Sequence, residues 1–458
     1  MIKHTYILLV LGITLLLGSC KKILELEPEQ SIDAATAIEN DGDVEALTIG
    51  AYSIMGEGGL YGTNLFMITD LLANEDYCSW AGTFSSYRQI ARRNMTPDNV
   101  DVTRTWRRAY AAINNANIVL ANLDKVSDAD LKQTLDGEAH FIRGIMLFEL
   151  VRIYAQPWNP GGTNAGPGVV IRLTPTLTET EAFTKTARSS IADVYTQVIK
   201  DLQDAATKMP EENGTRATKY TALAFLSRVY LQKSDFPNAL SAANDVIESE
   251  MYKMNASVGA VFSNKNTAES IWEIQQNDQN NAGESNDGMA TFYASFDGIG
   301  RADLRINTDF VDTYAAGDLR ATEWYYIGTG RRSGNTYCRK WASFSQNLPV
   351  IRIAEMFLTR AECNVRLSSS VGDTPENDLA KVRNTVRTNL ATITTPTLND
   401  ILNERFHELA FEGTRIHDLK RLKINTGDYA WNADELVFPI PQSDVDASEG
   451  VIVQNSGY

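Results

Sequence analysis

A group of charged residues near the carboxyl end is the densest set of side chains able to do acid–base chemistry. Three- and four-residue spacing places opposite charges side by side on one helical face and across the break at Gly413. One interpretation is an acid–base or anion-binding site. We favour the other, an ion-pair network that fixes how the last helices pack. The group contains Glu404, Arg405, Glu408, Glu412, Arg415, Asp418 and Arg421.

The sequence contains no nucleophile, metal or nucleotide signature. His407 lacks the partner histidine of a zinc-protease helix. The glycines at 328 and 330 miss the dinucleotide spacing, and Asp41-Gly42-Asp43 breaks the order of ligands in a calcium loop. A spatially paired set of glycosidase carboxylates stays open, because sequence does not give their separation. We therefore predict a protein that is not an enzyme and needs no metal or cofactor.

Aromatic residues beside polar ones indicate where a sugar could bind, because an aromatic ring stacks on the apolar face of a sugar while polar groups read its hydroxyls. The first such place contains Asn74, Tyr77 and Trp80, followed by Arg88. The second contains Trp324, Tyr325, Tyr326 and Trp341. We predict that these two places form the ligand site.

Each tryptophan also has a packing interpretation. Trp80 is equally well explained as a partly buried packing residue, and Trp341 as core beneath the loop. Trp324 and Tyr325 could alternate in a strand, so that at most two of the three consecutive rings face a ligand. The ligand-binding interpretation predicts that Trp80→Ala or Trp324→Ala weakens binding and leaves folding intact.

Helical periodicity dominates the segments that must position these residues. Apolar residues recur at three- and four-residue steps, which gives each segment one apolar stripe. Asp235 is a predicted N-terminal cap, and Pro210 stops the preceding pattern. The predicted helical segments are 104–125, 131–154, 190–209, 219–232 and a helix that follows Asp235.

Two neighbouring helical patterns have the form of a tetratricopeptide hairpin. Small residues occur from Tyr220 to Ala224 and at Ala239, where two helices approach closely. One hairpin cannot bury its own apolar face, so we expect it to stack on the pairs at 104–154 and 351–402. The predicted fold is all-α, a short solenoid of helical pairs, with a generic helical bundle as the alternative.

Two long segments, 156–188 and 275–349, interrupt the helical patterns and are too long for simple connectors. The second is rich in glycine, asparagine and aromatic residues. Loops held on a rigid scaffold often carry binding residues. We predict one domain from 41 to 458 with these two loop-rich insertions.

Charge and cysteine content limit the partners. The 458 residues have a formal net charge of −16 and no cluster of lysine or arginine, which argues against nucleic acid. A neutral glycan or peptide would be indifferent to this field. Besides Cys20 there are only Cys78, Cys338 and Cys363, which is no disulfide framework. At most one bridge could form, and we expect Cys363 to be a buried free thiol.

The first twenty residues are typical of a bacterial lipoprotein signal. A basic start precedes an apolar run that ends in Leu17-Gly18-Ser19-Cys20, and the run is shorter than a spanning helix of about 20 residues. We predict residues 1–19 as the signal peptide, Cys20 as the lipid-modified N-terminus and residues 20–40 as a tether. An ordinary secretory signal is the alternative.

Several motifs in the same order resemble the SusD/RagB family over essentially the whole chain. The strongest runs from Glu404-Arg405 through Glu408-Leu409-Ala410-Phe411-Glu412-Gly413 to Arg415 and Asp418-Leu419-Lys420-Arg421. The remaining motifs are Trp106, Tyr110, Ile113, Asn117, Gly137-Glu138-Ala139, Arg143, Tyr154, Arg352, Ala354-Glu355, Arg360-Ala361-Glu362, Val382-Arg383, Arg387, Phe438-Pro439-Ile440-Pro441 and Gln454-Asn455-Ser456-Gly457-Tyr458.

The resemblance implies a mostly helical outer-membrane lipoprotein with four tetratricopeptide-like pairs. It would bind an oligosaccharide at the cell surface and deliver it to a SusC-like TonB-dependent transporter. The matching motifs belong to the scaffold, so they do not identify the ligand. Peptide capture, a lid that binds nothing and a lipid-anchored hydrolase are the alternatives. Lys21-Lys22 after the lipidated cysteine leaves the face of the membrane undecided, so surface location follows only from the resemblance.

Overall fold

The computed structural model describes residues 38–182, 184–283 and 286–458. The predicted signal peptide, Cys20 and nearly all of the predicted tether lie outside the described residues.

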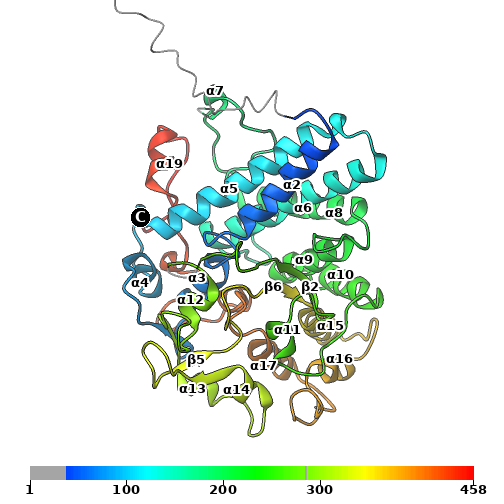
Figure 1. The fold of residues 1–458 in the computed structure, drawn as a ribbon, viewed down its shortest axis with the longest axis vertical. Coiled ribbons are helices and arrows are strands. Elements are labelled where there is room, and N and C mark those ends of the chain that lie inside the picture. The colour runs from blue at the N-terminus through cyan, green and yellow to red at the C-terminus, as the bar shows by residue number, and fades with distance from the viewer. Residues whose placement is uncertain (1–37, 183, 284–285) are drawn as a thin grey trace, which may run out of the picture.

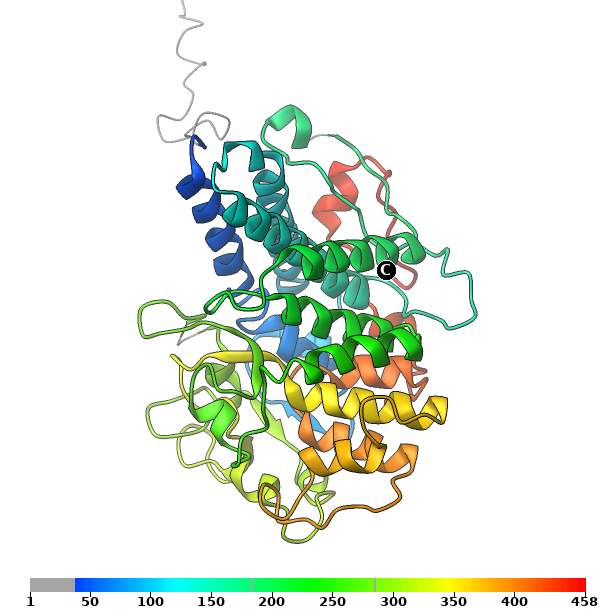
Figure 2. The same cartoon turned by 90° about the vertical axis from the view of Figure 1, so that its right-hand side faces the viewer.

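A stack of helices runs through the molecule, and each helix packs on the next one along the chain (Figure 2). The stack confirms the predicted solenoid of helical pairs. Its members are α2 (Asp41–Met55), α5 (Val100–Ala121), α6 (Ala129–Tyr154), α8 (Ile191–Lys208), α9 (Lys219–Gln232), α10 (Phe236–Glu248) and α15 (Ile353–Leu367). The helices α16 (Pro375–Val382), α17 (Leu398–Glu408) and α18 (Arg415–Arg421) extend it.

Local sequence explains where these helices begin. Asp235 caps α10 as predicted, since its side chain accepts a hydrogen bond from the backbone N–H of Asn238. Thr218 and Thr221 form a reciprocal capping box at the start of α9. Gly144 allows α6 to approach α8, because a Cβ atom there would meet Asp201 at 3.1 Å. Caps and small residues therefore set both the ends and the spacing of the stacked helices.

Short antiparallel strand pairs join distant parts of the chain. The pairs are β1 (Cys78–Trp80) with β3 (Leu304–Ile306), β2 (Ser270–Ile274) with β6 (Leu348–Arg352), and β4 (Tyr325–Ile327) with β5 (Thr336–Cys338). Figure 1 shows them below the upper helices. The strands β3, β4 and β5 lie within segment 275–349, and β6 begins in it. This segment therefore contains more regular structure than the sequence indicated.

Shorter helices complete the molecule. They are α3 (Asn64–Leu72), α4 (Ser85–Ala91), α7 (Glu179–Ala182), α11 (Ala260–Ser263), α12 (Met289–Tyr293), α13 (Thr308–Val311), α14 (Leu319–Glu323) and α19 (Gln442–Ala447), with the 3-10 turns η2 (Leu123–Lys125) and η3 (Asp434–Leu436). Among the described residues of segment 156–188, α7 is the only helix or strand.

The buried apolar residues form one large cluster that draws on helices from α2 to α18. Cys78, Cys338 and Cys363 are buried free thiols, so the predicted free thiol at Cys363 is confirmed. Within the described ranges, every helix is too short or too polar to cross a bilayer. The limits 41–458 of a single domain stay a prediction.

Candidate functional site

Glu408, at the end of α17, lies at the centre of the charged group near the carboxyl end. Its carboxylate accepts hydrogen bonds from Arg387 at 2.7 Å, Arg320 at 3.0 Å and Arg352 at 3.1 Å. Burial raises the pKa of Glu408, but these arginines together lower it well below its usual value. A buried carboxylate that stays ionised and faces arginines is held for packing, which is the interpretation we favoured.

A second centre of the same network joins α9, α15, α17 and α18. Arg405 donates to Asp418 at 2.9 Å and to Glu355 at 3.1 Å, and Arg228 donates to Glu355 at 2.6 Å. Burial raises the pKa of Glu355, and the two arginines outweigh it and lower the pKa to about 2. Glu355 is therefore an ionised link between helices.

Glu412 and Arg415 differ in their surroundings. Glu412 accepts hydrogen bonds from Lys340 at 2.6 Å and from Arg352 at 2.8 Å. Arg415 was predicted to join the network, but within the described residues it has no carboxylate within 4 Å. Its guanidinium instead lies 3.6 Å from the centre of the Phe406 ring. The prediction for Arg415 is wrong because α18 points this side chain at the ring.

Tyr77 and Asn74, predicted as ligand contacts, hold the first loop in place. Tyr77 is 1% exposed and stacks on Phe411 with ring centres 4.3 Å apart. Asn74 donates to the carbonyl of Ala91 at 2.8 Å and accepts from Arg93 at 2.6 Å. The prediction that Tyr77 faces a ligand is wrong, because the ring belongs to the core.

Trp324, Tyr325 and Trp341 are also core residues, with exposures of 1%, 4% and 0%. The indole N–H of Trp324 donates to the carbonyl of Val258 at 2.9 Å, and that of Trp341 to the carbonyl of Phe411 at 3.0 Å. The prediction that they face a ligand is wrong. Trp324 follows α14 and precedes β4, so it does not alternate with Tyr325 as a strand residue would.

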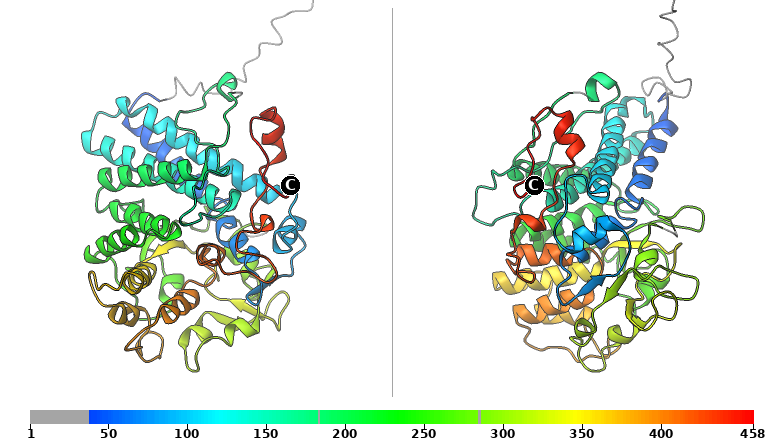
Figure 3. Two further views of the ribbon diagram at one scale, coloured as in Figure 1. Left: turned by 180° about the vertical axis from the view of Figure 1, so that it is seen from behind. Right: turned by 90° about the vertical axis from the view of Figure 1, so that its left-hand side faces the viewer.

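Trp80 ends β1 and is half-buried. Its ring lies 5.1 Å from Tyr87 of α4 and 5.8 Å from Phe292 of α12, centre to centre. The first predicted place and the second predicted region therefore come together here, and Figure 3 shows α4 beside the yellow-green loops. The indole N–H of Trp80 has no hydrogen-bond partner within the described structure.

An arginine lies against the half-buried ring of Phe84, and a second arginine is held nearby in the chain. The guanidinium of Arg301 lies 4.7 Å from the ring centre and donates to Asp303 at 2.9 Å. Arg88 is exposed, and its guanidinium donates to the carbonyl of Gly82 at 3.1 Å. Asp303 is fully buried and also pairs with Arg332. The loops therefore present arginine donors that are already oriented next to an aromatic ring.

Tyr326 in β4 is a second half-buried ring in the predicted loop regions. It stacks on Phe296 with ring centres 4.3 Å apart and an angle of 4° between the planes. Its hydroxyl accepts a hydrogen bond from the backbone N–H of Ser295 at 2.7 Å. The exposed Arg339 lies 5.0 Å from the Tyr326 ring centre. Tyr326 is the member of the three consecutive predicted rings that reaches the surface.

We name this set of half-buried rings and arginines the aromatic platform. Its members are Trp80, Phe84, Arg88, Phe296, Arg301, Tyr326 and Arg339. Rings supply flat apolar area, and oriented guanidinium groups supply hydrogen-bond donors, which is the combination that recognises a sugar or another flat polar molecule. Sequence reasoning missed Phe84, although it lies close to Trp80. It missed Arg301 and Arg339 because nothing local to them signals a ring nearby.

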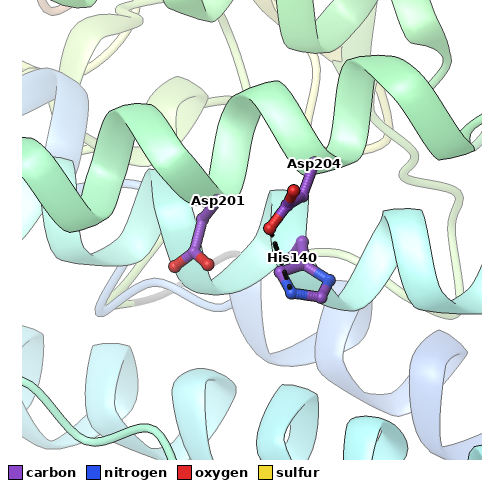
Figure 4. A group of neighbouring side chains, drawn as sticks. All are labelled: His140, Asp201 and Asp204. Atoms are coloured by element: carbon purple, nitrogen blue, oxygen red, sulfur yellow. Dashed lines mark ion pairs between the residues drawn. The ribbon is translucent and has the colours of Figure 1, made fainter.

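His140, Asp201 and Asp204 bring ligand-type atoms within 4.8 Å of one another between α6 and α8 (Figure 4). Asp201 is fully buried, and both of its oxygens accept hydrogen bonds from Arg143, at 2.6 Å and 3.0 Å. A cation would have to displace this arginine. We therefore assign the cluster to helix packing.

Comparison with known proteins gives two family matches. Residues 22–231 match the SusD-like family described as starch-binding and associating with the outer membrane, and residues 319–436 match the SusD family. The SusD-like protein P2 of Formosa agariphila is 28% identical over 251 residues, which cover 54% of this chain and 46% of that protein. The starch-binding protein SusD of Bacteroides thetaiotaomicron is 30% identical over 179 residues, covering 36% of this chain and 30% of that protein.

This chain spans about half the length of the SusD-like relatives from Formosa agariphila that it matches. Solved structures show the same fold over nearly the whole chain. A SusD superfamily protein from Bacteroides thetaiotaomicron has a TM-score of 0.80 and 23% identity, and covers 91% of this chain and 99% of its own. Another from Bacteroides vulgatus has a TM-score of 0.79 and 24% identity, and covers 92% of this chain and 100% of its own.

Proposed function

The chain belongs to the SusD family, and from this premise we propose that it binds an oligosaccharide at the aromatic platform and delivers it to a SusC-like TonB-dependent transporter. The observation that supports binding is the contact of Trp80 and Phe84 with the ring of Phe292, which comes from the distant helix α12. The starch-binding name of one relative agrees with a glycan ligand.

The geometry favours a sugar over a purely apolar ligand. Trp80 and Tyr326 are half-buried, so each ring is anchored on one side and reaches the surface on the other. Arg88 and Arg339 are exposed and can donate to hydroxyl oxygens, and Arg339 lies beside the Tyr326 ring. An arginine stacked on a ring loses little freedom when it binds, which favours affinity.

The proposed setting is the outer membrane, with lipid on Cys20 as the anchor and the platform facing the cell exterior. The family description, which places its members at the outer membrane, supports this setting. Protease treatment of intact cells tests the orientation. Digestion of the protein supports surface exposure, and full protection places the platform on the periplasmic side.

The transporter is proposed from family membership alone. Purification of the lipoprotein from detergent-solubilised membranes should bring a SusC-like transporter with it. A preparation in which the lipoprotein is always alone would contradict this part of the proposal and leave the binding part standing.

The proposal describes binding without turnover. Buried carboxylates near the carboxyl end face arginines, as at Glu408, whose pKa these arginines hold well below its usual value. Incubation with an oligosaccharide library should therefore yield bound glycan and no new reducing ends. Release of reducing ends would identify a hydrolase instead.

The test of the site is isothermal titration of the full-length lipoprotein with the glycan that the library identifies. Trp80→Ala and Tyr326→Ala should each weaken binding by about tenfold, which corresponds to about 1.4 kcal/mol of lost contact. Trp431→Ala is the matched control, because Trp431 is half-buried and lies outside the platform. Full affinity in both platform variants would refute the site. Binding of peptides alone would replace the glycan with a peptide ligand.

A further inference from the structure

A cavity of about 560 Å³ lies between α2, the loop that joins α8 to α9, and the β2 edge. It is large enough for a small organic ligand, since such sites range over about 300–1,000 Å³. Tyr52 and Ser53 line it from α2, Arg216 from the loop, and Trp272 from β2. The platform residues do not line this cavity, so it is a separate feature of the molecule.

The cavity combines aromatic surface with polar groups. The ring centres of Tyr52 and Trp272 lie 6.3 Å apart and are tilted at 55°. Beyond Trp272, residues Gln275 and Asn281 add amide groups to the lining. A ligand here would lie against rings on one side and reach hydrogen-bonding groups on the other.

Carboxylates exceed positive charges around the cavity. Glu45, Glu57 and Glu273 line it, and Arg216 is the basic residue in the described lining. Arg216 already forms two ion pairs, with Glu45 at 2.9 Å and with the buried Glu138 at 3.3 Å. Glu57 is also paired, with Arg108 at 2.7 Å, so Glu273 is the lining carboxylate that has no ion pair in the described structure. The uncompensated charge is therefore negative, which favours a positively charged ligand and disfavours an anion.

Glu273 supplies the second observation that points to a ligand. Its side chain is 3% exposed, and its Oε2 accepts hydrogen bonds from the backbone N–H of Asn266 at 2.9 Å and from the Asn347 amide at 2.8 Å. The other oxygen, Oε1, has no hydrogen-bond partner within the described structure. A buried carboxylate oxygen without a donor is costly, and a ligand donor would relieve that cost.

We propose that this cavity is a second ligand site, for a sugar-sized molecule that bears a protonated amine. The amine would lie toward Glu273, and the apolar face of the molecule against Tyr52 and Trp272. An ammonium group near aromatic faces gains from the ring quadrupole as well as from the carboxylates. The inference does not rest on the proposed glycan platform.

The test measures binding of D-glucosamine to the full-length lipoprotein by saturation-transfer NMR and calorimetry at pH 7. N-acetylglucosamine is the matched probe, because it has the same ring and lacks the positive charge. We expect glucosamine to bind in the millimolar range and N-acetylglucosamine at least about tenfold more weakly. Equal binding of the two sugars, or binding of neither, would overturn the proposal.

Variants locate the binding. Ser53→Trp places an indole into the cavity from an exposed helical position and should abolish glucosamine binding. Ser241→Trp is its control, since Ser241 is an exposed serine on α10 away from the cavity. Glu57→Gln removes a carboxylate from the lining and leaves Arg108 without this partner, so it should weaken binding of the cation two- to threefold. Unchanged binding in Ser53→Trp would show that the amine binds elsewhere.

Trp80→Ala separates this proposal from the glycan platform. It should leave glucosamine binding unchanged while it weakens binding of the platform ligand. Loss of both would mean that glucosamine occupies the platform, and the second site would then be rejected.

Discussion

Trp80 and Trp324 are the same residue type in loop-rich segments, and their surroundings decide their different roles. Trp80 ends a strand at the surface, whereas Trp324 is enclosed by Phe262, with ring centres 5.9 Å apart, and by Lys340, whose amine lies 3.8 Å from the ring centre. Trp80 is therefore proposed for binding, while Trp324 contributes to stability.

Trp324→Ala should lower the free energy of unfolding by about 3–5 kcal/mol, because it leaves a cavity and removes the hydrogen bond to Val258. Urea denaturation followed by circular dichroism measures this loss. The folded fraction should keep its affinity for the platform ligand, in contrast to Trp80→Ala. A stable Trp324→Ala protein with weakened binding would return this residue to the ligand site.

Sequence could identify which loops matter but not which ring in a loop is exposed. The packing of Trp324 depends on Phe262 of α11 and on Val258 just before that helix. The surface position of Tyr326 depends on its stacking with Phe296. Such contacts join residues far apart in the chain, so neither periodicity nor local composition encodes them in a single sequence.

At the scale of elements, helices were predictable because their signals are local. The pattern 219–232 coincides with α9, and Asp235 caps α10 as its side chain predicts. The strand pairs were not predictable, because their members lie far apart in the chain. For example, β1 pairs with β3, which places Cys78 opposite Ile306. The pairing partner of a three-residue strand cannot be read from its own sequence.

The links between α9, α15, α17 and α18 predict how stability depends on acid. The arginines around Glu355 and Asp418 outweigh burial and hold both pKa values at about 2, below their usual values of 4.5 and 3.8. Their contribution to stability is therefore complete above about pH 4.5 and is lost as the pH falls toward 2. For Glu355 alone the loss is about 3 kcal/mol. Urea denaturation at a series of pH values measures it.

Asp70→Asn is the control for this acid dependence. Burial raises the pKa of Asp70 to about 8, so its carboxyl is protonated in both folded and unfolded chains at low pH. The variant should reduce the fall in stability between about pH 4 and pH 8 and leave the loss of stability below about pH 4 unchanged. If Asp70→Asn no longer lost stability at low pH, the assignment to Glu355 and Asp418 would be contradicted. A wild-type protein that is equally stable at pH 2.5 and pH 4.5 would contradict it as well.

At the scale of the whole molecule, the last residues of the chain pack on helices from its first third. The indole N–H of Trp106 in α5 donates to Asp444 in α19 at 2.9 Å, and Figure 3 shows the red α19 near the cyan helices. The backbone N–H of Phe438 donates to the carbonyl of Ile153 at 2.9 Å. A solenoid whose end returns to its beginning is expected to unfold as one unit, whereas an open stack can fray from one end.

Asn455 tests this closure. Its side-chain amide donates to the carbonyl of Tyr154 at 2.8 Å and to that of Phe438 at 2.7 Å, so it joins the end of α6 to the returning segment. Asn455→Ala should lower the free energy of unfolding by about 1–3 kcal/mol, because buried carbonyls lose a donor. Far-ultraviolet and near-ultraviolet circular dichroism should still report one coincident transition. Ser456→Ala, at the exposed neighbouring position, should change nothing. Two separate transitions in Asn455→Ala would show that the returning segment melts independently and that the stack does not depend on it.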